Sequence, residues 1–106
     1  MLTQNYLKLL SVDGVNRFCS KPYGFELLIL LYDFTRNNDE YGIEETFEMI
    51  HNNRCKRPAF LSFVKYLEAE GIIFRIQSKV KKSRSLLRLN QDTIDQIDLV
   101  NGLDEL

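Results

Sequence analysis

The chain has 106 residues, of which 44% are hydrophobic and 27% are charged, with 14 basic and 15 acidic side chains. This length and composition predict one globular domain over residues 1–106. The longest apolar run, residues 27–32, is too short to span a bilayer, and the first ten residues lack the basic start of a secretory signal. We therefore expect a cytoplasmic protein with no membrane partner.

Positive charge is concentrated in one stretch of the sequence. Residues 54–88 hold ten of the Lys and Arg side chains and two acidic ones, whereas the rest of the chain holds four basic and thirteen acidic side chains. Such segregation suggests that one surface binds a polyanion, most simply nucleic acid. We expect cationic side chains from two elements of this stretch to converge on one surface, and the remaining exterior to be anionic.

The sequence offers little for catalysis or metal binding. Cys19, Cys55 and the single histidine, His51, do not have the spacing of a metal cluster. We expect free, reduced thiols, with Cys55 as a candidate redox-sensitive residue because Lys56 and Arg57 follow it. The sequence has no glycine-rich phosphate loop, nucleophile elbow or paired-carboxylate signature. The prediction is a protein that is not an enzyme, with no catalytic residues, metal site or cofactor.

The first third of the chain predicts helices. Apolar residues recur at helical spacing over residues 2–18, and Asp13-Gly14 predicts a break or a bend that divides this segment into two short pieces. Ser20 and Pro22 indicate the cap and first turn of a helix over residues 22–36. Because its FELLILLYDF segment is apolar almost all round, this helix is expected to form the core.

A polar turn at residues 37–40 is expected to lead into a very short strand at residues 41–43 and then into a helix that begins at Glu44. Phe47 and Ile50 are expected to face inward. Three acidic residues form the predicted solvated face of this helix, and we expect them near the DNA side, where they weaken binding: Glu44, Glu45 and Glu48.

The next helix is predicted to open at Arg57-Pro58 and to end at Gly71, a residue suited to a left-handed C-terminal position. Apolar residues at helical spacing form its predicted buried stripe: Phe60, Phe63, Val64 and Leu67.

A β-hairpin is predicted to follow, with strands at residues 72–77 and 86–89 joined by a basic turn at residues 78–85. Ile72, Phe74 and Ile76 alternate along the first strand and form its predicted apolar face, and we expect Phe74 in the core. The turn contains no acidic residue, so the sequence indicates no local partner for Arg84.

Asn90 is predicted to cap a final helix, with Ile94, Ile97, Val100 and Leu103 on one side and Thr93, Asp95, Asp98 and Asn101 on the other. The terminal segments contain more apolar residues than peripheral helices need, which predicts a homodimer. The expected dimer interface consists of Tyr6, Leu9, Leu10, Ile94, Ile97 and Val100.

The order of these elements predicts an α+β, mainly α fold, a winged helix-turn-helix. Its three-helix core and β-hairpin wing occupy residues 22–89, with N-terminal dimerisation helices in residues 1–19 and a C-terminal helix in residues 90–106. In this fold one face of the second helix packs, while the other remains free to enter the major groove.

Three segments resemble MarR/SarA-type winged-helix regulators: GIEET at 42–46, RPAF at 57–60 and FVKYLEAEGII at 63–73. The last contains a spaced motif of that family at Val64, Leu67, Gly71 and Ile72, and the resemblance covers about residues 22–97. It implies a homodimeric transcription regulator that binds double-stranded DNA with sequence specificity.

The resemblance assigns groove-facing positions to Arg57, Ala59, Ser62 and Lys65, and wing positions to Lys79, Lys81, Lys82 and Arg84. Arg54 and Lys56, which precede the helix, complete the candidate DNA-binding set, because a helix N-terminus favours phosphate contacts. Two other functions remain open: a plasmid or phage partition or replication adaptor that binds DNA, and a winged helix used for protein–protein contacts.

Overall fold

The computed structural model describes residues 7–52 and 55–105, without the side chains of residues 101 and 103–105. The fold is α+β and mainly helical, with one antiparallel hairpin in the described part. Helical residues 7–10 are followed by α2 (Asp13–Phe18), α3 (Gly24–Asn37), α4 (Ile43–Met49), α5 (Arg57–Ala69), β1 (Ile73–Gln77), β2 (Ser85–Leu89) and α6 (Gln91–Glu105). The helices within the described ranges are all too short or too polar to cross a membrane.

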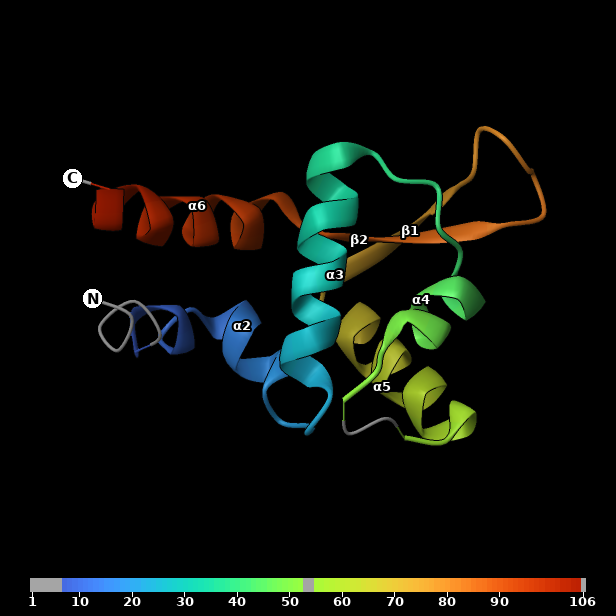
Figure 1. Cartoon of the computed structure of the whole chain (residues 1–106), viewed down its shortest axis with the longest axis horizontal. Helices are drawn as coiled ribbons and strands as arrows, with labels where there is room; N and C mark the ends of the chain where they lie inside the picture. Colours follow the sequence, from blue (N-terminus) through green and yellow to red (C-terminus); the bar gives the residue numbers. More distant parts are fainter. Residues whose placement is uncertain (1–6, 53–54, 106) are drawn as a thin grey trace.

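Helix α3 lies at the centre of the molecule, with α4, α5 and the hairpin toward one end and α6 with residues 7–10 toward the other (Figure 1). Its buried residues are Gly24, Leu27, Leu28, Leu31 and Phe34, so the prediction of a central core helix is confirmed. One side of this apolar helix nevertheless faces outward, since Ile29 is 50% exposed.

The first helix boundaries differ from the prediction. The chain leaves helical geometry at residues 11–12, so Asp13 and Gly14 begin α2 and do not break it. Ser20 does not cap α3, because its hydroxyl donates to the Arg17 carbonyl oxygen (2.9 Å) and closes α2. Gly24, not Pro22, then begins α3 after a tight turn.

Helices α2 and α3 meet closely at this turn. A Cβ atom on Gly24 would lie 1.6 Å from the carbonyl oxygen of Phe18, the last residue of α2. This approach is therefore possible only for glycine.

Helices α4 and α5 follow the predicted pattern. Phe47 and Ile50 are buried, and the expected short strand is a single bridge between Gly42 and Leu86. The predicted α5 stripe is buried at all four positions: Phe60, Phe63, Val64 and Leu67. Gly71 follows α5 with a φ of 74°, the left-handed conformation that ends a helix.

The predicted apolar face of the first hairpin strand is wrong at two of its three positions. In the observed register Phe74 lies opposite Arg88, and Ile76 opposite Leu86. Phe74 and Ile76 are exposed, and Phe74 is not in the core, whereas all four residues from Leu86 to Leu89 are buried. Strand β2 packs against α3 and α4 and is bridged to Gly42 on the side away from β1, so the packing around β2 buries it, while most of β1 stays exposed.

Asn90 caps α6 as predicted, since its side-chain oxygen accepts the Thr93 N–H (2.8 Å). Ile94, Ile97 and Val100 are buried within the single chain. Thr93, expected on the outer side, is also buried, because α2 packs against the first turn of α6 with Gly14 beside the Thr93 side chain. Leu99 is exposed, and the Leu103 side chain lies outside the described part.

The Gly24 contact predicts a large difference between two glycine-to-alanine changes in helices. Gly24→Ala should lower the free energy of unfolding by about 1–3 kcal/mol or more, because the new methyl group overlaps the Phe18 carbonyl. Gly102→Ala in α6 should be neutral or stabilise by up to about 1 kcal/mol, since nothing lies within 4 Å of its Cβ position. Urea unfolding of the two variants measures both, and equal stabilities would contradict the packing argument.

Candidate nucleic-acid interface

The outward face of α5 carries the predicted groove-facing residues. Arg57, Ala59, Ser62 and Lys65 are all exposed. They do not form one compact cluster, because Ala59 and Ser62 line a hollow of about 420 Å³ beside Ser20 and Lys21, whereas Arg57 lies toward α4. Lys56 is exposed just before the helix, and Arg54 lies outside the described residues.

The tip of the hairpin presents three predicted lysines to solvent. Lys79, Lys81 and Lys82 are exposed, and no carboxylate of the described chain forms an ion pair with them. Backbone hydrogen bonds hold the turn in shape: the Ser78 N–H donates to the Arg84 carbonyl (3.0 Å) and the Arg84 N–H to the Lys81 carbonyl (2.9 Å). The lysines therefore extend from an ordered turn.

Glu40, in the connector between α3 and α4, holds this turn from the side. Its Oε1 atom accepts the Ser78 hydroxyl (2.7 Å) and the backbone N–H groups of Lys79 (3.0 Å) and Val80 (3.3 Å). These donors favour the charged form, so the hydrogen bond from Ser78 and those from Val80 and Lys79 lower the pKa of Glu40. The carboxylate thus occupies a small anion-binding nest made by the hairpin turn.

Two hairpin arginines complete the attachment of the connector. Arg84 donates from Nη1 to the Glu40 carbonyl (2.8 Å), and Arg88 donates from Nη1 to the Leu87 carbonyl (3.1 Å) and from Nη2 to the Asp39 carbonyl (2.5 Å). Arg88 is 4% exposed, and its burial lowers the pKa of the guanidinium. Arg88 therefore holds the hairpin to the connector and cannot contact a ligand. This leaves the hairpin with one fewer exposed cation than its sequence suggests.

Glutamates accompany most of the remaining arginines. Arg57 pairs with Glu44 at the start of α4, Arg84 pairs with Glu45 in the same turn, and Arg75 of β1 pairs with Glu68 of α5. The hydrogen bond between Arg57 and Glu44 lowers the pKa of the carboxyl and raises that of the guanidinium. Cations of α5 and of the hairpin do meet around α4, but the surface between them carries both signs of charge.

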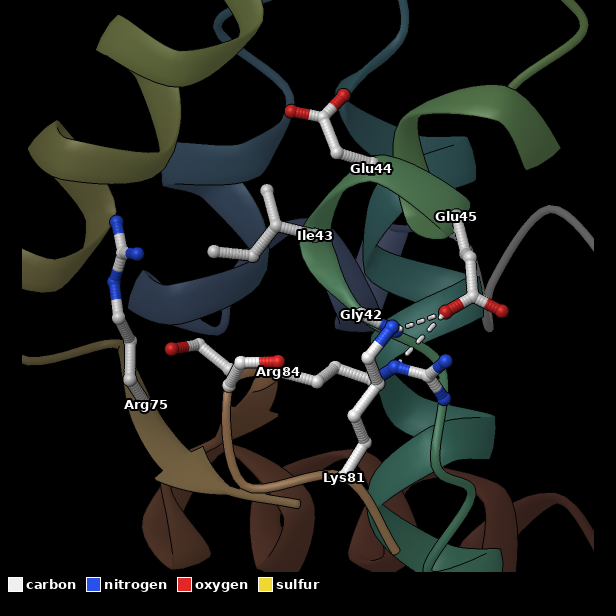
Figure 2. A pocket seen from close by; sticks show the side chains of 9 residues that line it. Gly42, Ile43, Glu44, Glu45, Arg75, Lys81 and Arg84 are labelled. Carbon is white, nitrogen blue, oxygen red and sulfur yellow. Dashed lines mark hydrogen bonds and ion pairs between the residues drawn. The ribbon is translucent and has the colours of Figure 1, made fainter.

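A polar hollow of about 420 Å³ lies where α4 meets the hairpin (Figure 2). Gly42 to Glu45 form one wall, and the other comes from Arg75, Lys81 and residues 83–85. Arg75 was not among the residues predicted from the sequence, although a basic residue at an outward position of an alternating strand indicates an exposed cation at this surface. Glu44 and Glu45 were predicted to form a merely solvated face, because their partners are distant in sequence.

No three His, Cys, Asp or Glu side chains in residues 7–52 and 55–105 are grouped so as to hold a metal ion. Cys19 and Cys55 are free and half-buried, and burial raises the pKa of the Cys19 thiol. Redox sensitivity of Cys55 stays a prediction.

The Glu40 nest predicts a pH-dependent contribution to stability. Because folding lowers the Glu40 pKa, wild type should gain stability over Glu40→Gln at neutral pH, and this gain should disappear as pH falls through the folded-state pKa. Unfolding of both proteins in urea from about pH 7 to about pH 3 measures the difference. All other titratable groups are shared by the two proteins. A difference in unfolding free energy between wild type and Glu40→Gln that did not change with pH would therefore rule out the nest.

Comparisons with known proteins add no relative. The chain matches none of the protein-family models, none of the curated proteins and none of the solved structures against which it was compared.

Proposed function

We propose that this protein binds double-stranded DNA with sequence specificity as a winged-helix protein, in which α3, α4 and α5 form the helical core and the β1–β2 hairpin is the wing. One observation carries the proposal. The Arg57 end of α5 and the basic hairpin, far apart in sequence, flank the same turn of α4 and are each joined to it by an ion pair. Both are exposed, as a groove-binding helix and a phosphate-contacting wing require.

In this proposal the position of each basic group decides whether it contacts bases or phosphates. Ser62 and Lys65 lie on the outward side of α5, and with Arg57 they reach base edges in the major groove. Lys79, Lys81 and Lys82 extend from the hairpin turn and neutralise phosphates. Phosphate contacts supply affinity and position, and base contacts supply specificity.

We further propose that the protein is a homodimeric transcription regulator of MarR/SarA-like type. Because α6 already buries Ile94, Ile97 and Val100 within one chain, pairing must use other apolar residues. Exposed Ile29 lines a hollow of about 230 Å³ together with Leu9, Phe25, Leu28, Tyr32 and Ile97. Leu7 and Leu99 are also exposed, and they belong to helical residues 7–10 and to α6, the elements at the end away from the hairpin (Figure 1). Leu10 is half-buried, and Tyr6 lies outside the described residues.

A second candidate function, protein–protein contact through the hairpin, has one observation in its favour. Phe74, Ile76 and Val80 are exposed apolar residues of the edge strand and the turn. Edge strands and exposed apolar residues favour pairing with another chain.

Charge-removing variants test DNA binding. Wild type should bind a labelled duplex of random sequence with an affinity that falls steeply with salt, because about six phosphate contacts release counterions. Lys81→Ala should weaken binding to every duplex and reduce the salt slope by about 1. Arg57→Ala should in addition relax the preference for a duplex selected from a random pool, by about 1–3 kcal/mol. Fluorescence anisotropy at several salt concentrations measures all of these values.

Lys8→Ala serves as the control, since this exposed lysine belongs to helical residues 7–10, a segment at the end opposite the hairpin (Figure 1). Binding that is insensitive to salt, or equal losses from Lys8→Ala and Lys81→Ala, would refute the proposed interface. Function that persists without Lys79, Lys81 and Lys82 but is lost with Phe74→Ser would instead favour the protein-contact candidate.

Dimerisation is tested by placing charge on either apolar surface. Wild type should sediment as a dimer at micromolar concentration, and Ile29→Glu should be monomeric, because the new carboxylate must be desolvated in the interface. Phe74→Glu is the matched control: Phe74 is 45% exposed and Ile29 is 50% exposed, but Phe74 lies on the hairpin. A wild-type monomer, or a dimer disrupted by Phe74→Glu alone, would refute pairing at the α3–α6 end.

A further inference from the structure

Two successive glutamates at the start of α4 each hold an arginine from a different element. The Glu44 carboxylate accepts the Arg57 Nε–H at both oxygens (2.8 Å at Oε1 and 3.0 Å at Oε2) and also contacts Arg57 Nη2. Two nitrogens of one guanidinium therefore contact one carboxylate, an arrangement that fixes direction as well as distance. Arg57 is the first residue of α5.

The second glutamate acts on the hairpin. Glu45 Oε1 lies 3.4 Å from Arg84 Nε and also accepts the Gly42 N–H (3.1 Å), so this carboxylate is itself fixed (Figure 2). Arg84 is held at another point, since its Nη1 donates to the Glu40 carbonyl (2.8 Å). Adjacent positions on a helix point about 100° apart, which lets residue 44 face α5 while residue 45 faces the hairpin.

These contacts are poorly explained by fold stability or by DNA affinity. The side chains are 56% and 58% exposed in the Arg57–Glu44 pair and 30% and 46% exposed in the Arg84–Glu45 pair. Pairs that solvent reaches in this way stabilise a fold only weakly. Two carboxylates beside a DNA surface also repel phosphate. What the pairs do provide is restraint, because an unpaired arginine loses about 2 kcal/mol of rotamer entropy when it becomes ordered.

We propose that Glu44 and Glu45 are positioning residues for sequence recognition, which hold the guanidinium groups of Arg57 and Arg84 at a fixed separation before DNA arrives. The inference rests on the proposed DNA binding and adds to it the origin of specificity. Glu44 sets the major-groove contact made by α5, and Glu45 sets the contact made by the hairpin. The first turn of α4 thereby determines the spacing between these two contacts on the duplex.

Neutralising each glutamate separates positioning from simple repulsion. The probes are a duplex selected by wild type and a random duplex of equal length, both titrated by anisotropy at the same salt concentration. Glu44→Gln and Glu45→Gln should each bind the random duplex about two- to fivefold more tightly, because a negative charge is lost. Each should also lower the ratio of selected to random affinity by roughly tenfold, because the arginine loses its fixed direction.

Asp92→Asn is the control, since it removes one negative charge from an exposed side chain at the start of α6, and it should leave the ratio unchanged. Sequence selection by the variants gives a second readout. Glu44→Gln should relax preference at the base positions that Arg57→Ala relaxes, and Glu45→Gln at those that Arg84→Ala relaxes. Thermal unfolding of the Glu→Gln variants should stay close to wild type, so that a changed ratio reports recognition and not folding.

The outcomes distinguish the inference from the proposed function. If the glutamine variants bind both duplexes more tightly by equal factors, the glutamates only repel, and the inference is overturned while DNA binding stands. If they relax base positions unrelated to Arg57 and Arg84, the inference is likewise overturned. If wild type shows no salt-sensitive binding to either duplex, the proposed function fails, and the inference fails with it.

Discussion

The structure depends on the attachment of the basic hairpin to the connector that follows α3. A two-stranded hairpin has little stability of its own in water. Here Glu40 accepts three donors from the turn, and Arg84 and Arg88 donate to backbone carbonyls of Glu40 and Asp39. These contacts, with the buried leucines of β2, fix the hairpin relative to α4. Without them, lysines at the tip would have no defined position relative to α5.

The charges of this region fall into two groups. Lys79, Lys81 and Lys82 are exposed on the turn, whereas Arg57, Arg75 and Arg84 are each paired with a glutamate from a neighbouring element. A mobile ammonium suits non-directional attraction to phosphate, and a restrained guanidinium suits directional hydrogen bonding. On the proposed function, the mixed charge of this surface favours discrimination between sequences at the expense of raw affinity.

The apolar surface is also divided between two ends of the molecule. Leu7 and Leu99 belong to helical residues 7–10 and α6, the elements opposite the hairpin (Figure 1), and Ile29 lines a hollow with Leu9 and Ile97 of these elements. Phe74, Ile76 and Val80 belong to the hairpin. Ile29 of the first set lines a hollow against α3, so a partner there would extend the existing core. In the second set, Phe74 and Ile76 lie on β1, which pairs with β2 on one side, and Val80 lies in the turn. Self-association and contact with another protein would thus use separate surfaces.

Local patterns in the sequence determined most of the secondary structure. Four features were predictable because each depends on neighbouring residues: the Phe60-to-Leu67 stripe, the left-handed Gly71, the Asn90 cap and the basic turn. Tertiary structure decided which strand residues are buried and which charged residues form pairs. Phe74 is exposed and Arg88 buried because α3, α4 and the Gly42 bridge cover β2 and leave most of β1 open, which alternation alone does not reveal. The partners of Arg57 and Arg84 are glutamates 13 and 39 positions away, brought close only by the packing of α4 against its neighbours.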